Sequence, residues 1–475
     1  MKNSLNINRL GAAFLIMLLL VMGSSCKDEK ADYINLSANS FTFSSNGKEE
    51  LQINVDASQN WSVTYTEDWV IEKEKTGQSI TLGAMPTQSG SVRSSKIIFR
   101  AGQAMEVVEL SQLGTNVTYT LLDLNSVKTV MSPGGKYVAG VATTIVGNNY
   151  EYTPFIINTF TGAKTDKPKL SKNYVATAVS DEGLLILSEE AIFTSKYYNE
   201  LDELADIKLP VGYDQPKVEA VSSDGKVFVG FVHKKDDNRN YPAKWTNGEP
   251  QLLEMPEKTL LGALLDVGAY ARGCSADGSI IYGAIGDDQT ALYWKEDGKV
   301  HFVGEDMIRK HTITTNTTGY EETYQVADRP IFYADNTSIS ADGKLLATTF
   351  LEITVANKAE KGIYYPAYFD IEKNKLICVK DLPDGYEDAS GITISNDGIL
   401  TFSAPSTAFI AGYVYNIHTN TVTRSQDYFR EKYGVTLTSN NTVINQFSDD
   451  LRTLFGTNMV VQGSVYQFWY LNVND

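Results

Sequence analysis

The residues best suited to bind a sugar are aromatic and basic side chains in the longest interval between two copies of a repeated turn. They are Tyr320, Tyr324, Arg329, Phe332 and Tyr333. Aromatic faces pack on the C–H surface of a sugar ring, while neighbouring polar groups bind its hydroxyls. We therefore predict a ligand site here, to which Arg272, just before another copy of the turn, also contributes. The alternative is that this segment packs its own aromatic rings for stability.

Two tryptophans near the N-terminus form a second candidate site. Trp61 precedes Ser62-Val63, and Trp69 precedes Val70, so each adjoins β-forming residues. Both rings could stack on a sugar, but tryptophans that flank a turn in a small sandwich also serve as core residues. The sequence leaves both roles open.

No arrangement typical of catalysis or metal binding is found in the sequence. The four histidines, His233, His301, His311 and His418, are not spaced with other ligands as metal sites require. Acidic residues that are adjacent in sequence point to opposite faces of a strand, so they do not form a glycosidase pair. The adjacent acids are Asp287-Asp288, Glu321-Glu322 and Asp449-Asp450. We predict no enzyme activity, no metal and no cofactor, with an acid and a base from separate repeats as the alternative.

A repeated turn must position the candidate residues of the C-terminal part. A serine followed by Asp-Gly or a variant of it, and then by β-forming residues, occurs seven times, at Ser132, Ser180, Ser222, Ser275, Ser340, Ser395 and Ser448. Asp-Gly between apolar runs predicts a hairpin, because glycine adopts a positive φ without steric cost. An aromatic strand and a further turn follow in several copies, so each repeat predicts about four strands.

This repeat resembles the HAF-type extracellular repeats and, more broadly, WD40-like and TolB-like propellers, in which Ser-x-Asp-Gly follows the innermost strand. The resemblance covers residues 116–475 and implies a seven-bladed β-propeller. The last repeat has an aromatic third strand, residues 466–473, and we predict that residues 119–124 supply its fourth, which leaves no open edge. Two insertions, residues 305–310 and 425–434, are predicted to be helical.

The N-terminal residues 1–25 have the features of a bacterial signal peptide. Lys2 and Arg9 accompany an apolar run too short to span a bilayer, and small residues lead to Cys26. This pattern resembles a lipoprotein signal, which implies that Cys26 is acylated and anchors the protein. Residues 26–33 are a predicted tether, whose Lys-Asp-Glu-Lys run resembles the surface-export signal of Bacteroidetes lipoproteins. The resemblance implies an outer-membrane lipoprotein at the cell surface; the periplasmic face and an ordinary cleaved signal are the alternatives.

Residues 34–114 lack the repeat and alternate polar and apolar residues like a small sandwich. Trp61-Ser62-Val63, Trp69-Val70, Arg93 before a strand and Gln112-Leu113-Gly114 resemble the pattern of the BACON domain, a module proposed to bind carbohydrate. The resemblance implies an immunoglobulin-like β-sandwich. Such modules also act as spacers, so the sequence leaves sugar binding by this segment open.

Composition limits the classes of partner. The 475 residues exceed one ordinary core, and the formal net charge is −17. Without a basic stripe, such a surface repels nucleic acid. Cys274 and Cys378 lie in apolar contexts in different repeats, which favours two buried thiols over a disulfide.

Together, these features predict an all-β protein with an immunoglobulin-like β-sandwich at residues 34–114, followed by a seven-bladed β-propeller at residues 115–475. We predict that it binds glycans at the cell surface without catalysis. A scaffold that docks onto outer-membrane proteins is the alternative, and a propeller-type glycan lyase or hydrolase is the third possibility.

Overall fold

The computed structural model describes residues 31–473 apart from residues 88, 123–125, 148, 190, 193, 200, 318–319, 333–338, 357–358, 383–387, 406–409, 437–441 and 461–464. The predicted signal peptide and Cys26 lie outside the described residues. The described chain is nearly all β, with a single α-helix, α2 (Ser425–Tyr433), and a 3₁₀ turn, η1 (Glu305–Met307). It divides into two compact units. Of the described residues, the smaller contains residues 31–39, Glu50–Ala84 and Ser95–Glu109, and the larger contains Ser40–Glu49, Met85–Ser94 and those from Leu110 to Val473.

The first eight strands form two four-stranded sheets with the orders β1-β3-β6-β5 and β2-β8-β7-β4. The strands are β1 (Ile34–Leu36), β2 (Ser40–Phe43), β3 (Leu51–Ala57), β4 (Ser62–Tyr65), β5 (Val70–Lys75), β6 (Ser79–Ala84), β7 (Arg93–Ala101) and β8 (Ala104–Gln112). Burial alternates along β3, where Leu51, Ile53 and Val55 are buried and the residues between them are exposed. One face of this strand therefore packs into a core, as its sequence pattern predicts.

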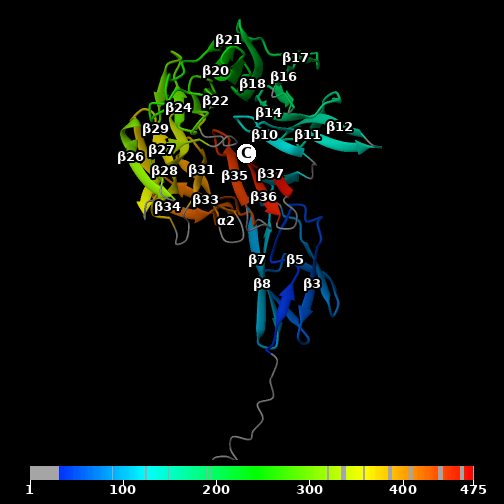
Figure 1. The fold of residues 1–475 in the computed structure, drawn as a ribbon. Helices are drawn as coiled ribbons and strands as arrows, with labels where there is room; N and C mark the ends of the chain where they lie inside the picture. The colour runs from blue at the N-terminus through cyan, green and yellow to red at the C-terminus, as the bar shows by residue number, and fades with distance from the viewer. Residues whose placement is uncertain are drawn as a thin grey trace, which may run out of the picture. The chain divides into compact units, whose positions relative to one another are not determined.

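The described strands from β9 onward form seven sheets, six with four strands and one with five. Consecutive strands within each sheet pair antiparallel. Figure 1 shows the sheets following one another around a common centre. The buried clusters combine residues of neighbouring sheets, so packing between sheets forms the core.

The strands of the first four sheets are β10 (Ser126–Met131), β11 (Tyr137–Val146), β12 (Asn149–Asn158), β13 (Lys164–Asp166), β14 (Tyr174–Val179), β15 (Leu185–Glu189), β16 (Thr194–Tyr198), β17 (Leu204–Asp206), β18 (Tyr213–Val221), β19 (Val227–Lys234), β20 (Arg239–Thr246), β21 (Glu249–Leu252), β22 (Ala269–Cys274), β23 (Ile281–Ile285), β24 (Ala291–Trp294) and β25 (Val300–Phe302). Those of the last three are β26 (Arg309–Thr317), β27 (Tyr320–Ile331), β28 (Leu345–Ala356), β29 (Ala359–Asp370), β30 (Lys375–Cys378), β31 (Ser390–Ile394), β32 (Ile399–Pro405), β33 (Ile410–Asn416), β34 (Thr421–Arg424), β35 (Thr442–Phe447), β36 (Thr453–Val460), β37 (Val465–Val473) and β9 (Val117–Leu122).

In each of the seven sheets the serine of the repeated turn accepts a backbone N–H from the residue four or five positions later. In the third sheet the Ser222 hydroxyl accepts a hydrogen bond from the Val227 N–H at 3.0 Å and donates one to Asp224 Oδ1 at 2.7 Å. Gly225 closes the turn with a φ of 72°, which glycine adopts without strain. In every copy the serine is buried and its Oγ accepts a backbone N–H, from Tyr137, Leu184, Val227, Ile280, Leu345, Ile399 and Thr453 respectively.

The last sheet is completed by the strand that precedes the first sheet. Strand β9 pairs with β37, from Val117 opposite Val473 to Leu122 opposite Phe468. This confirms the predicted pairing for its described residues. In the same sheet, the buried Asn472 Nδ2 donates to Thr159 Oγ1 in the first sheet's last turn at 3.3 Å. The beginning and end of this unit are therefore joined by backbone and side-chain hydrogen bonds.

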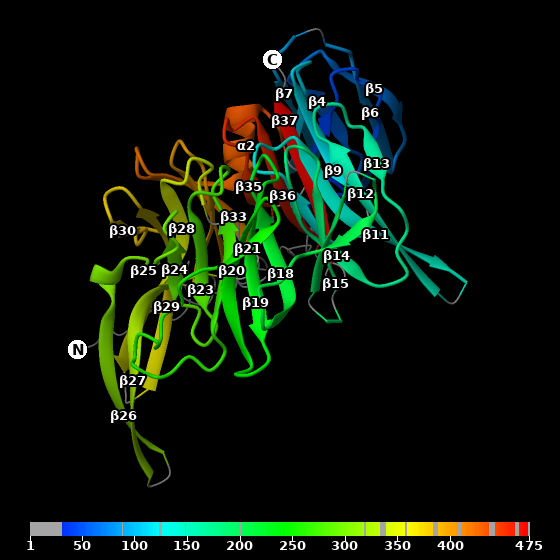
Figure 2. The same ribbon diagram turned by 90° about the horizontal axis from the view of Figure 1, so that it is seen from above.

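One predicted insertion is a helix and the other is not. Helix α2 ends at Gly434, whose φ is 65°, as predicted for a glycine-capped helix. The prediction of a helix at residues 305–310 is wrong, because only η1 forms there and β26 follows. The run of threonines in β26 favours an extended strand. Strands β26 and β27 form a long hairpin that extends away from the neighbouring sheets (Figure 2).

Replacing the buried serine of one turn tests this geometry. Ser222→Ala leaves the Val227 N–H without its acceptor, so we expect a loss of about 1–3 kcal/mol in the free energy of unfolding, measured by urea titration. The control is Ser223→Ala, whose side chain is outside these bonds.

The Ser222 hydrogen bond lowers the pKa of Asp224 from 3.8 to about 2. This stabilisation is present above pH 3.8 and is lost as the pH falls through 2, and Ser222→Ala reduces the loss. Equal stability of the two variants would contradict the role of the serine.

Candidate functional site

A cavity of about 130 Å³ lies where the inner strands β10, β14, β18, β22, β31 and β35 meet, and Ile339, which bridges to Leu346 of the fifth sheet, also lines it. One water needs roughly 10–15 Å³ by this measure, so the cavity has room for a small polar molecule. Each sheet contributes to the lining, through Lys128, Thr177, Glu219, Arg272, Ile339, Thr393 and Gln446 in chain order. We call this space the axial cavity.

A β-bulge in the inner strands sets which side chains reach the axial cavity. In β14, β18 and β22 the pairing register shifts by one residue, and the extra residues are Thr177, Glu219 and Arg272. Each stands three positions before the serine of its turn. A bulged residue is left out of the ladder and its side chain is redirected. The bulges therefore present three polar side chains to the cavity.

The cavity lining has an apolar part and a polar part. The residues directly before the serines are mostly apolar, and they are Met131, Val179, Val221, Cys274, Ile339 and Phe447. The bulge positions and their neighbours supply the charged and hydrogen-bonding groups. An arrangement of this kind orients a ligand that has both a C–H surface and polar substituents.

Part of the Arg272 guanidinium contacts protein groups, and part has no hydrogen-bond partner among the described residues. Its Nη2 donates to Gln289 Oε1 at 3.1 Å, and its guanidinium carbon lies 5.3 Å from the Tyr270 ring centre. Its Nε is buried and has no hydrogen-bond partner among the described residues. Gln289 has a φ of 59°, an uncommon conformation for a residue other than glycine. The turn that orients Arg272 therefore keeps a backbone strain that the surrounding structure must compensate.

Two further polar groups of the lining lack protein partners. Thr177 is 5% exposed, and its Oγ1 has no hydrogen-bond partner among the described residues. The Glu219 side chain has no hydrogen bond or ion pair within the described part of the chain. Thr177 is buried, where polar groups normally have partners because desolvation without a hydrogen bond is costly, whereas Glu219 is half-buried and keeps contact with solvent. These groups are therefore available to a ligand.

Of the six ligand-binding residues predicted in the repeat region, Arg272 lines the axial cavity. Arg329 is oriented elsewhere, because its Nη2 donates to the Asp288 carbonyl at 3.2 Å and its Nη1 to the Ala327 carbonyl at 3.0 Å. The bond to the Asp288 carbonyl holds the turn that contains Gln289, so Arg329 supports Arg272 indirectly.

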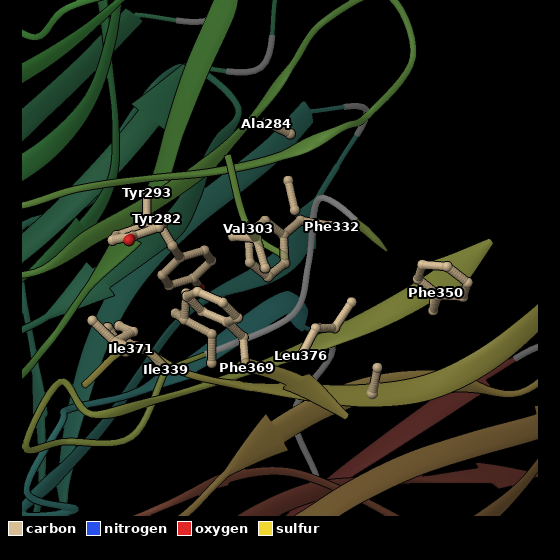
Figure 3. Close-up of a cluster of buried hydrophobic side chains, with 13 residues drawn as sticks. Tyr282, Ala284, Tyr293, Val303, Phe332, Ile339, Phe350, Phe369, Ile371 and Leu376 are labelled. Carbon is tan, nitrogen blue, oxygen red and sulfur yellow. The ribbon is translucent and has the colours of Figure 1, made fainter. Parts of the chain in front are cut away.

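Two of the aromatic residues of the same group, Tyr324 and Phe332, are not part of the described cavity lining. Phe332 is 1% exposed, and its ring centre lies 5.1 Å from that of Tyr282 in the buried cluster of Figure 3. Tyr324 is half-buried on β27 of the long hairpin. Tyr320 lies at the start of the same strand, and Tyr333 is outside the described residues.

The two predicted tryptophans of the smaller unit have different environments. Trp69 is buried, with 3% of its surface exposed. Trp61 is half-buried, its Nε1 donates to the Gly77 carbonyl at 2.9 Å, and Lys75 Nζ lies 4.3 Å from its ring centre. Phe99 lies 5.7 Å away, so neighbouring residues cover much of the Trp61 ring.

Other potentially reactive groups are engaged or insulated. Within the described residues, no group of three or more His, Cys, Asp or Glu side chains could hold a metal ion. His233 and His311 pair with Asp214 and Asp328, each at 2.9 Å. Burial raises the pKa of the Cys274 thiol to about 12. It is therefore protonated at neutral pH and a weak nucleophile.

The sequence contains a signal for the cavity that the analysis of motifs missed. The position three residues before each serine is polar in several repeats, as at Thr177, Glu219 and Arg272, although an inner strand is otherwise apolar. Simple alternation does not identify these positions, because a bulge changes the face to which a side chain points.

Comparisons with known proteins give no family assignment. No family model matches the chain, and no curated protein matches it. Solved structures with loose similarity include an oligogalacturonate lyase in complex with manganese, with 11% identity, a TM-score of 0.41, and coverage of 82% of this chain and 96% of that one. The β-propeller domain of the Trilobed protease from Pyrococcus furiosus has 12% identity, a TM-score of 0.43, and coverage of 74% and 93%. A putative TolB from Agrobacterium tumefaciens has 11% identity, a TM-score of 0.33, and coverage of 71% and 98%. We base no assignment of function on these similarities.

In the described part of the chain, none of the helices has the length and apolar character needed to cross a membrane.

The two thiols provide a test of the environment in the cavity. Burial raises the pKa of Cys274 to about 12 and that of Cys378 to about 11, so the native thiolate of Cys274 is the more strongly suppressed. We expect iodoacetamide to label native Cys274 more slowly than Cys378, and both thiols rapidly in urea, as measured by peptide mass spectrometry. Native labelling of Cys274 at its urea rate would contradict its burial.

Proposed function

We propose that the larger unit is a seven-bladed β-propeller that binds one sugar residue of a glycan in its axial cavity, without catalysis. The observation that carries this proposal is the set of polar groups in the lining that have no partner among the described residues: Arg272 Nε, Thr177 Oγ1 and the Glu219 carboxylate. Each is directed by a bulge of an inner strand.

The chemistry of the lining suits a polyhydroxylated ring. Each sugar hydroxyl can donate and accept a hydrogen bond, so it needs acceptors such as Glu219 and donors such as Arg272. Thr177 can do either. The apolar residues before the serine turns offer a surface for the ring's C–H groups.

The lining also supports binding over hydrolysis. Glycosidases use two carboxyl groups on opposite sides of the bond that is cleaved. Glu219 is the single carboxylate among the described lining residues, so the cavity lacks that pair.

A docking scaffold is the second candidate, and one surface feature favours it. The tip of the β11–β12 hairpin exposes three apolar side chains, Ile145, Val146 and Tyr150, by 72%, 53% and 60%. Exposed apolar patches often mark protein contacts. Ligand binding in the cavity and docking through this hairpin use separate residues, so mutations distinguish them.

The rest of the chain fits presentation at a cell surface. We propose that Cys26 carries the lipid anchor on the outer membrane. The N-terminal sheets would form an immunoglobulin-like sandwich of the BACON type that acts as a spacer. The buried Trp69 favours a spacer over a sugar-binding module, although the half-buried Trp61 lines a surface pocket.

A glycan array with the whole mature protein tests the binding function. We expect binding to a limited set of glycans, and Glu219→Gln should weaken it tenfold or more without changing the melting temperature, because the amide keeps the shape but loses the charged acceptor. The control is Tyr320→Ala with Tyr324→Ala, on the hairpin away from the cavity lining, which should bind like the wild type. Loss of binding in the tyrosine variant alone would place the site on the hairpin instead.

Lipid attachment is tested separately by Cys26→Ser. With a clickable fatty acid supplied to the producing bacterium, the wild-type protein should be labelled and sediment with membranes. The variant should lose both properties, because a thiol is required for acylation. Equal labelling of wild type and variant would contradict the anchor.

A further inference from the structure

The charges around the axial cavity differ from those of the whole protein. The chain has a formal net charge of −17, but the described lining contains two cations, Lys128 and Arg272, and one carboxylate, Glu219. Arg272 forms no ion pair with a described carboxylate, so its charge favours a ligand that has a negative group.

Arg272 has no carboxylate partner of its own. Its one side-chain hydrogen bond to a protein group goes to the neutral amide of Gln289, and it forms no ion pair with a described residue. Arg272 is half-buried, and its buried Nε has no hydrogen-bond partner among the described residues, so a planar carboxylate, which matches the forked N–H groups, could supply one. Arg272 is also fixed in place, through Gln289 and the Tyr270 ring, so its open side is oriented before a ligand arrives.

Glu219 lines the same cavity and yet forms no ion pair with Arg272. The two opposite charges are therefore held apart by the bulges of neighbouring inner strands, β18 and β22. A ligand that satisfies both must present an acceptor with negative charge to Arg272 and hydrogen-bond donors to Glu219. A carboxylic acid with several hydroxyl groups meets both requirements.

The size and polarity of the axial cavity further limit the class of ligand that it can bind. The volume of about 130 Å³ suits a single ring and not a long chain. Thr177 and Gln446 add hydrogen-bonding groups, and the apolar residues before the serines add a surface for C–H groups. These features together are typical of one sugar ring.

We propose that the axial cavity recognises an acidic sugar, a uronic acid, with its carboxylate on Arg272 and its hydroxyls on Glu219. This inference rests on the proposed glycan-binding function and adds the class of sugar. Arg272 is the residue that determines specificity for acidic over neutral sugars.

The test is isothermal titration of the whole mature protein with matched sugars, D-galacturonate against D-galactose and D-glucuronate against D-glucose. We expect the uronates to bind at least tenfold more tightly than the neutral sugars. Arg272→Gln should remove this preference, and Arg272→Lys, which keeps the charge but not the fork, should retain part of it. Lys299→Gln makes the same change of charge at an exposed position and should leave the preference unchanged. Circular dichroism establishes that each variant is folded.

The outcomes separate this inference from the function on which it rests. Equal affinity for neutral and acidic sugars would overturn the acidic-sugar proposal while glycan binding stands. Acetate or lactate binding as tightly as the uronates would show that hydroxyls are not recognised, and would overturn both. No binding of any of these probes, with a silent glycan array, would also overturn both. Retention of the preference in Arg272→Gln, with a fold like the wild type, would contradict the role of Arg272.

Discussion

The buried serine hydroxyl of the repeated turn is the interaction on which the larger unit depends. It accepts the N–H that begins the second strand of the sheet, and in four copies it also donates to the aspartate of the turn, at Asp224, Asp277, Asp342 and Asp450. A hydroxyl buried without these bonds would destabilise the fold, so the position admits few other residues. Because the turn fixes the end of each inner strand, it also fixes the position along the strand of the bulge three residues earlier. Polar side chains from different sheets therefore reach the same cavity.

Closure of the last sheet supplies the second constraint. Strand β9 pairs with β37, and Asn472 reaches Thr159 of the first sheet. An inner strand has a fixed neighbour on each side only when the set of sheets is closed. The cavity therefore depends on contacts far from its own lining, between residues more than 300 positions apart in sequence.

Much of this architecture could be predicted from the sequence, since local signals specify it. The seven serine turns follow from turn chemistry. The pairing of residues 119–122 with the last sheet follows from the need of an edge strand for a partner. The helix before Gly434 follows from glycine capping. The hairpin β26–β27 was missed, because the short polar run at Glu305 resembles the start of a helix while the threonines that follow favour a strand.

The site was less predictable, for a physical reason. Aromatic residues such as Phe332 satisfy the composition of a sugar site and of a core equally well, and burial decides between the two only in the folded chain. Thr177 and Glu219 were not selected, because a bulge reverses the side on which a residue lies, and periodicity does not reveal bulges. Arg272 was selected for its position before a serine turn, and that position is what directs it inward.

The most direct test of the account is a crystal structure of the protein soaked with D-galacturonate. The account predicts one sugar ring in the axial cavity, with its carboxylate within hydrogen-bonding distance of the Arg272 guanidinium and a hydroxyl within that distance of Glu219. A ring bound on the β26–β27 hairpin or at Trp61, with the cavity containing only water, would contradict it.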